Sequence, residues 1–155
     1  MNLKNFTVKA LATSFGVGFL PLMPGTFASF AGVLVYLVVK DNPLVYILVT
    51  VLIIILGFLV SGAAEKLFNK KDPGFVVIDE VSGMLLSLLF VPYGIKWVIA
   101  AFFIFRILDT LKPYPAGKFE NMKGSAGIML DDIVAAVYTN LVLQVVVRFA
   151  SFKAS

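Results

Sequence analysis

The chain has 155 residues, of which 60% are hydrophobic and only 14% are charged. A soluble domain of this size carries roughly 45–50% apolar and about 25% charged residues, so the composition predicts one membrane-embedded domain over residues 1–155. The net charge is +4, and the sequence has no basic patch of the DNA-binding kind. In a membrane protein, this positive charge indicates how the chain is oriented and that it meets anionic lipid headgroups, rather than that it binds nucleic acid. Because Cys and His are absent, thiolate nucleophiles, Ser-His-Asp triads, phosphohistidine and Cys- or His-liganded metals are excluded.

The first twenty-odd residues predict an interfacial or re-entrant segment. Lys4 and Lys9 precede an apolar run as in a signal peptide, but Gly and Pro residues interrupt it and no small-residue cleavage site follows. The segment PGTFAS, residues 24–29, then predicts the start of a helix. Free backbone N–H groups there, with Thr26 or Ser29, could bind a phosphate, although an ordinary capped helix start explains the same residues.

Five apolar runs follow, and a membrane crossing needs about 20 apolar residues. Only the run 44–64 meets that length without an internal charge. The others are 27–39, which is short, 75–92, 95–111 and 128–150. The sequence therefore predicts an all-α, polytopic membrane helical bundle with four or five hydrophobic helices, and it leaves homo-oligomerisation open.

The charged residues are distributed unevenly between the two sides of this predicted bundle. Counting crossings from the run 27–39 places nine of the thirteen Lys and Arg residues on one side, which the positive-inside bias makes the cytoplasm. Six acids fall at helix ends on the same side: Asp72, Asp79, Glu80, Asp109, Asp131 and Asp132. Because ionisable residues at membrane depth are costly, each is a candidate functional residue.

The segment DPGFVVIDEVSG, residues 72–83, combines a turn with an acidic helix start. Asp72 before Pro-Gly suits a turn. Asp79 and Glu80 lie about 100° apart around a helix and can both face one cavity. The alternative is that the helix dipole favours acids near its N-terminus, which does not require two acids within an apolar run.

The segment FRILDTLKPYP, residues 105–115, places Arg106, Asp109 and Lys112 at three-residue steps on one helical face. Arg can hold phosphate oxygens in a bidentate fork, and Lys adds a point charge. A salt-bridge ladder with snorkelling cations at the membrane boundary is the alternative explanation. The sequence thus indicates a site for an anionic ligand or a boundary ladder.

The segment GSAGIMLDDIVAA, residues 124–136, begins the last apolar run with two adjacent acids. Asp131 and Asp132 could supply oxygen ligands to Mg²⁺ together with the acids of the run 75–92. Helix capping by Asp explains one of them but not both. Asn140 and Gln144, one turn apart, are better explained as hydrogen-bonding partners between helices than as catalytic groups.

The four segments PGTFAS, DPGFVVIDEVSG, FRILDTLKPYP and GIMLDDIVAA, in this order and spacing, resemble the signature blocks of phosphatidylglycerophosphatase A, a small bacterial membrane lipid phosphatase. The resemblance extends from about Gly16 to Ala136. Ala28 and Ala136 stand where the family commonly has Gly. The resemblance implies Mg²⁺-dependent hydrolysis of phosphatidylglycerophosphate to phosphatidylglycerol and phosphate, in the cytoplasmic leaflet of the bacterial inner membrane.

The hypothesis that follows gives each polar residue a role. Asp79, Asp131 and Asp132 bind the metal, and Glu80 is a further ligand or the base that orients the attacking water. A carboxylate nucleophile, Asp79 or Asp131, is the alternative to direct attack by water. The remaining roles are phosphate binding and support: Arg106, Lys112 and Thr26 hold the phosphate, Asp109 orients Arg106 or joins the metal shell, and Asp72 and Ser29 are second-tier.

Two other classes of membrane protein share some of these features. A CDP-alcohol phosphotransferase also has an acidic metal site, but its DGxxAR block is missing from this sequence. A small ion or proton transporter subunit would also use intramembrane carboxylates near helix breaks. Transporters usually place such groups near the midplane, whereas these acids gather at one face.

Overall fold

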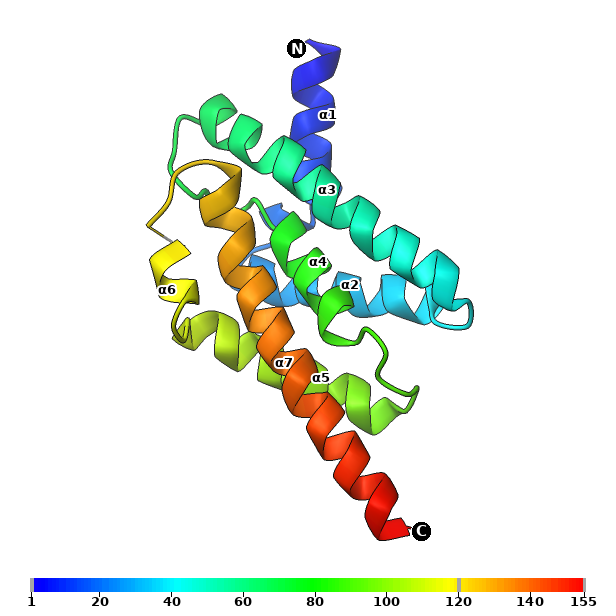
Figure 1. Cartoon of the computed structure of the whole chain (residues 1–155). Helices are drawn as coiled ribbons and strands as arrows, with labels where there is room; N and C mark the ends of the chain where they lie inside the picture. The colour runs from blue at the N-terminus through cyan, green and yellow to red at the C-terminus, as the bar shows by residue number, and fades with distance from the viewer. Residues whose placement is uncertain (1, 120, 155) are drawn as a thin grey trace.

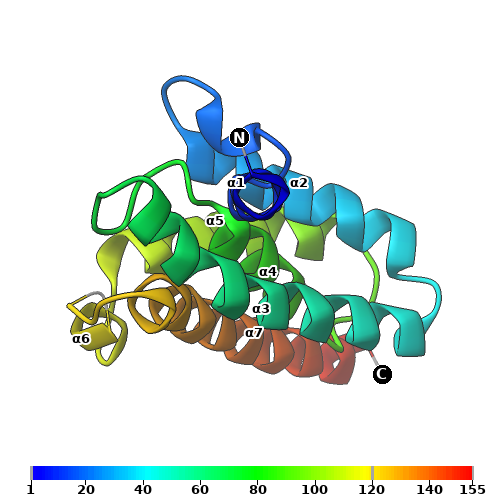
Figure 2. The same ribbon diagram turned by 90° about the horizontal axis from the view of Figure 1, so that it is seen from above.

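The computed structural model describes residues 2–119 and 121–154, and over these residues it contains helices and no strand. Helix α4 lies at the centre and contacts α2, α3, α5 and α7, as the two ribbon views show (Figures 1 and 2). In chain order the elements are α1 (Leu3–Ala12), the short 3-10 helix η1 (Val17–Phe19), α2 (Pro24–Val39), α3 (Pro43–Leu67), α4 (Ile78–Ser87), α5 (Ile95–Leu111), α6 (Ala116–Phe119) and α7 (Ser125–Ala154). The predicted all-helical class is confirmed.

Proline and a capping side chain set the helix boundaries that the sequence predicted most closely. Pro24 and Pro43 occupy the first turns of α2 and α3, where a missing backbone N–H costs nothing. The Asn42 side chain caps α3 by accepting from the N–H of Val45 at 3.2 Å. At the end of α5, Lys112 adopts a left-handed backbone with φ of 46° and precedes a proline, so the helix cannot continue.

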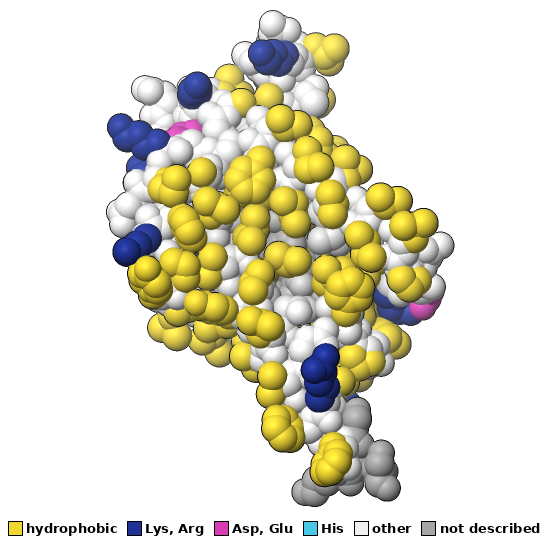
Figure 3. Space-filling view, in the orientation of Figure 1, with side chains coloured by type: hydrophobic (Ala, Val, Ile, Leu, Met, Phe, Trp, Pro, Cys, Tyr) yellow, Lys and Arg dark blue, Asp and Glu magenta, His cyan; other side chains and the backbone are white. Residues whose placement is uncertain are grey.

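Two helices are long and apolar enough to cross a membrane: α3, and α7 over Ser125–Ala150. Only 28% of the most apolar stretch of α3, and 22% of that of α7, is buried within the protein. On α3 the large residues Leu44, Leu48, Leu52, Ile55 and Leu59 form an exposed stripe at helical spacing. Figure 3 shows apolar side chains over the middle of this face, with Lys and Arg at its margins and toward its lower end. This outward-facing apolar surface is what a bilayer would cover.

Helix α4 corrects the expectation that residues 75–92 form a membrane-spanning candidate. It has 10 residues, of which eight are buried, and a helix of that length is only about 15 Å long. The run is apolar because other helices cover it. An apolar sequence alone does not tell whether its side chains will be surrounded by protein or by lipid. Side chains of α7 donate to carbonyls at and just after the C-terminus of α4: Asn140 donates to Ser87 and Leu89 at 3.1 and 2.7 Å, and Gln144 donates to Leu89 at 3.3 Å.

Small residues allow the surrounding helices to approach α4 closely. At Gly83, an added Cβ would lie 2.6 Å from the Phe105 ring of α5. Gly83 therefore lets the ring of Phe105 pack directly against the backbone of α4. The predicted count of four or five hydrophobic helices is not confirmed, since two described helices pass the length and composition test. For the N-terminal segment, the interfacial or re-entrant placement stays a prediction.

Candidate active site

The four polar segments come together at one end of the bundle. The starts of α2, α4 and α7 and the end of α5 meet there, at the left side of Figure 1. Antiparallel packing produces this convergence, because α5 runs toward the end from which α2 starts. The prediction that these segments share one face of the molecule agrees with this arrangement.

Three carboxylates form the centre of this end. Asp79 and Glu80 on α4 and Asp132 on α7 each offer one oxygen, and these oxygens lie within 4.8 Å of one another. One oxygen of each group, Oδ1, Oε2 and Oδ2 respectively, is buried and has no hydrogen-bond partner in the described chain. Burial, followed by the charges of Glu80 and Asp132, raises the pKa of Asp79 well above its ordinary value. Burial also raises the pKa of Glu80.

The chemistry of these groups fits a hard divalent cation. Buried carboxylates without partners are costly, and oxygen ligands are those that Mg²⁺ prefers. The candidate site itself brings together five carboxylates and two cations, with a formal charge of −3: the acids are Asp79, Glu80, Asp109, Asp131 and Asp132, and the cations are Arg106 and Lys112. A bound cation would offset this excess, so the residues present fit Mg²⁺.

Arg106 and Asp109 are held side by side on α5. Arg106 Nη1 lies 2.9 Å from Asp109 Oδ2, one helical turn away. Apart from this ion pair the buried nitrogen makes no hydrogen bond within the described chain, so it keeps donor capacity for a ligand. The charge of Asp109 also acts on Glu80 and Asp132. Asp109 therefore lies between the arginine and the three carboxylates and can orient Arg106.

Lys112 and Asp131 form a second pair, which links the end of α5 to α7. Lys112 Nζ donates to Asp131 Oδ2 at 2.8 Å, and the Asp131 side chain is 7% exposed. Asp131 and Asp132 are about 100° apart on the helix, so only Asp132 joins the three-carboxylate group while Asp131 faces the lysine. The role of Asp131 as a metal ligand stays a prediction.

The start of α2 contributes a contact that sequence reasoning missed. A Cβ at Gly25 would collide with Glu80 Oε1 and would lie 3.3 Å from Arg106 Nη1. Only a glycine lets the first turn of α2 approach the carboxylate and the guanidinium this closely. The sequence signal that could have indicated this close approach is the glycine of PGTFAS, which precedes Thr26.

The remaining predicted site residues lie at different depths. Thr26 is half-buried in the first turn of α2. Ser29 is fully buried and donates its hydroxyl to the carbonyl of Gly25 at 2.9 Å, which occupies that proton within the helix. Asp72 is exposed in the loop between α3 and α4, where its backbone has φ of 40°. Asp72 is therefore not one of the buried acids of α4 and α7, and its second-tier role stays a prediction.

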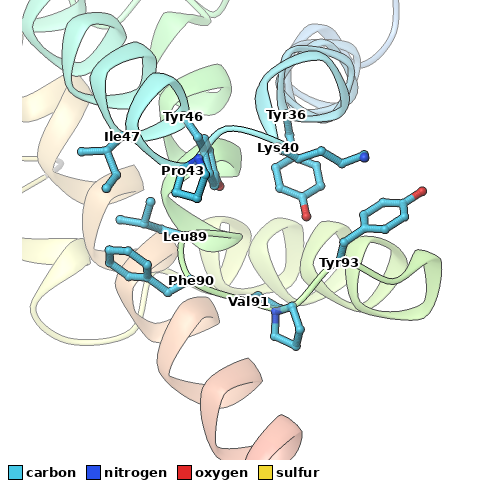
Figure 4. Close-up of a pocket in the computed structure, with 10 residues that line it drawn as sticks. Tyr36, Lys40, Pro43, Tyr46, Ile47, Leu89, Phe90, Val91 and Tyr93 are labelled. Carbon is cyan, nitrogen blue, oxygen red and sulfur yellow. The ribbon is translucent and has the colours of Figure 1, made fainter.

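A separate cavity of 250 Å³ lies at the other end of α2. Tyr36, Lys40, Tyr46 and Tyr93 line it (Figure 4), and the Tyr46 hydroxyl donates to the Leu85 carbonyl at 2.5 Å. Lys40 is held by Asp41 at 2.7 Å and stacks over the Tyr93 ring. Since this cavity contains none of the clustered acids, it is distinct from the candidate active site.

Comparisons with known proteins agree with the site's chemistry. The sequence profile of the phosphatidylglycerophosphatase A family matches residues 10–147. The Escherichia coli protein named phosphatidylglycerophosphatase A is 41% identical to this chain, over 82% of this chain and 76% of the relative. The Haemophilus influenzae protein of the same name is 32% identical, over 88% of this chain and 86% of the relative. A Bacteroides thetaiotaomicron protein with the provisional name phosphatidylinositol-3-phosphatase is 38% identical over 94% of this chain and 96% of its own length. No solved structure shows a significant match.

Proposed function

Because this chain belongs to the phosphatidylglycerophosphatase A family, whose members are lipid phosphomonoester hydrolases, we propose that its substrate is phosphatidylglycerophosphate. Water cleaves the terminal phosphomonoester, and the products are phosphatidylglycerol and inorganic phosphate. The observation that carries the proposal is the site itself, where three buried carboxylates lie beside an arginine that keeps free donor capacity. An ion or proton transporter subunit is not favoured, because the family match covers most of the chain.

We assign the metal to the three-carboxylate group. Asp79, Glu80 and Asp132 would hold Mg²⁺, which when bound supplies charge neutralisation for the transferring phosphoryl group. Glu80 has a second proposed role as the base that orients the attacking water. A Glu80→Gln variant separates the two roles, since lost metal affinity indicates a ligand and lost turnover at full metal affinity indicates the base.

The cations of α5 bind the phosphate in this proposal. Arg106 donates to phosphate oxygens from its buried Nη1, and Asp109 fixes the guanidinium. Lys112 adds a second positive charge and is held in place by Asp131. Thr26, at the start of α2, is the further phosphate-binding residue. Phosphoryl transfer depends chiefly on positioning and charge neutralisation, which these groups supply without Cys or His.

The proposed setting is a multi-pass protein of the bacterial inner membrane with this site facing the cytoplasm. The support is the pair of apolar, outward-facing helices and the excess of lysines at the same end. A site at the cytoplasmic rim lets the lipid substrate enter sideways from its own leaflet. Labelling of single introduced cysteines from each side of sealed vesicles tests this orientation. Labelling that places the candidate active site on the periplasmic side would overturn the proposed orientation.

The defining experiment measures phosphate release by the purified protein in detergent micelles. The substrates are phosphatidylglycerophosphate, phosphatidic acid and phosphatidylinositol 3-phosphate, each with Mg²⁺ and with EDTA. We expect metal-dependent release from the first lipid, and loss of that release in Asp79→Asn and Asp132→Asn. The matched control is Asp41→Asn, which removes an exposed acid at the other end of the bundle.

The outcomes separate the competing substrates and chemistries. Release from phosphatidylinositol 3-phosphate alone would transfer the assignment to the activity named for the Bacteroides relative. Release from none of the lipids by folded protein would contradict the enzyme assignment. A phosphoenzyme trapped on Asp79 or Asp131 would replace direct attack by water with a carboxylate nucleophile.

A further inference from the structure

A basic groove of 510 Å³ lies at the end of α3, outside the site described above. Its lysines come from two distant parts of the sequence: Lys66 lies in the last turn of α3, Lys70 and Lys71 follow its end, and Lys123 precedes α7. All four lysines are exposed. Figure 3 shows Lys and Arg side chains gathered at this edge, the upper left of the view.

Two hydrogen bonds fix the groove by tying its two walls together. The Glu65 carboxylate accepts from the N–H of Gly124 at 2.6 Å, and the Ser125 hydroxyl accepts from the N–H of Gly62 at 2.8 Å. The carboxylate of Glu65, the acid that lines the groove, therefore binds the backbone of the opposite wall. The lysines from both segments consequently surround one space with a net positive charge.

The position of the groove relates it to the membrane surface. Both walls are continuous with the candidate spans, because α3 ends at Leu67 and α7 begins at Ser125. Leu67 and Met122, each next to a groove lysine in sequence, are exposed apolar residues. A soluble anion would need the charges but not the apolar neighbours, whereas a phospholipid has both a phosphate and acyl chains.

The groove is also separate from the catalytic group. Asp132 lies seven residues along α7 from Ser125 at the groove wall, which corresponds to about 10 Å along the helix axis. None of the three clustered carboxylates lines the groove. The contacts that hold a molecule at the lysines therefore do not bring it to the three clustered carboxylates.

We propose that this groove binds the phosphodiester headgroup of an anionic phospholipid from the surrounding leaflet, as a second lipid site that does not carry out hydrolysis. The four lysines pair with the lipid phosphate, and Leu67 and Met122 contact the upper acyl chains. The inference depends on membrane insertion but not on the hydrolysis proposed above.

Native mass spectrometry of the full chain in detergent, titrated with dioleoylphosphatidylglycerol, tests the proposal. The groove variant is Lys70→Gln/Lys71→Gln/Lys123→Gln, and the control Lys4→Gln/Lys96→Gln/Lys118→Gln removes the same charge from exposed lysines elsewhere. We expect the apparent Kd of one bound lipid to weaken roughly 100-fold in the groove variant. The control variant and a Lys→Arg triple variant at the groove should bind as the unmodified protein does.

Three results would overturn the proposal. The first is equal binding by the groove and control variants. The second is equal retention of zwitterionic dioleoylphosphatidylcholine, which would remove charge as the basis of binding. The third is displacement of the lipid by inorganic phosphate, which would identify a soluble anion as the occupant. Because the readout is lipid binding, failure of the proposed hydrolysis leaves the test unaffected.

Discussion

The contact between Gly25 and Glu80 leads to a prediction about Gly25→Ala. The added Cβ would collide with Glu80 Oε1, and about 1 Å of movement is needed to restore ordinary contact. Arg106 Nη1, 3.3 Å from the same Cβ, leaves little room on that side. A misplacement of about 1 Å in a catalytic constellation costs on the order of 100-fold in rate, or about 2.7 kcal/mol of barrier. We therefore expect kcat to fall about 100-fold.

Stability measurements distinguish this effect from simple unfolding. Alanine is a better helix former than glycine by up to about 1 kcal/mol, which offsets part of the cost of the collision, so the thermal unfolding midpoint of Gly25→Ala in detergent should change little. The matched control is Gly74→Ala, whose Cβ meets no atom within 4 Å, and which should keep full phosphate release. Full activity in Gly25→Ala, or loss of activity together with loss of folded protein, would refute the reasoning.

Three further predictions concern the supporting contacts. Asn140→Leu removes the side-chain donor to the Ser87 carbonyl and one of the two donors to the Leu89 carbonyl, and should lower the free energy of unfolding by about 1–3 kcal/mol, whereas the exposed control Asn121→Leu should not. Lys112→Met removes the partner of Asp131 and should raise KM for the lipid at least about tenfold, with recovery in Lys112→Arg; an unchanged KM would exclude phosphate binding by this lysine. In EDTA, the unfolding midpoint should rise as the pH is lowered, because the raised pKa values of Asp79 and Glu80 make the folded protein bind more protons than the unfolded chain. Saturating Mg²⁺ should remove this trend, and a midpoint that falls with decreasing pH in EDTA would contradict it.

Much of the helical arrangement could be predicted from local signals. The bounds of α5 match the predicted run 95–111, because Gly94 precedes its start and a left-handed Lys112 with a following proline ends it. The run 44–64 lies within α3 for similar reasons. Asn140 and Gln144 are confirmed as partners between helices, since polar groups deep in an apolar helix need acceptors on a neighbour.

The parts that failed depend on tertiary packing. Nothing local distinguishes the apolar residues of α4, which face other helices, from those of α3, which face outward. In the same way, the sequence pair Asp131 and Asp132 does not reveal that one acid binds Lys112 and the other joins the carboxylate group. The direct contact of Gly25 with Glu80 arises between helices 55 residues apart in sequence and is visible only in the folded arrangement.

The dependence of α4 on α7 has a consequence for biogenesis. During synthesis α3 can partition into the bilayer alone, since its length and composition suffice. Helix α4 is too short to do so, carries two acids, and depends on Asn140 and Gln144 of α7 as donors to the carbonyls at and just after its end. The ribosome must therefore release α7 before the three-carboxylate group can assemble. Nascent chains interrupted before α7 would insert α3 but lack Asp132, Asn140 and Gln144, so the three-carboxylate group would stay incomplete.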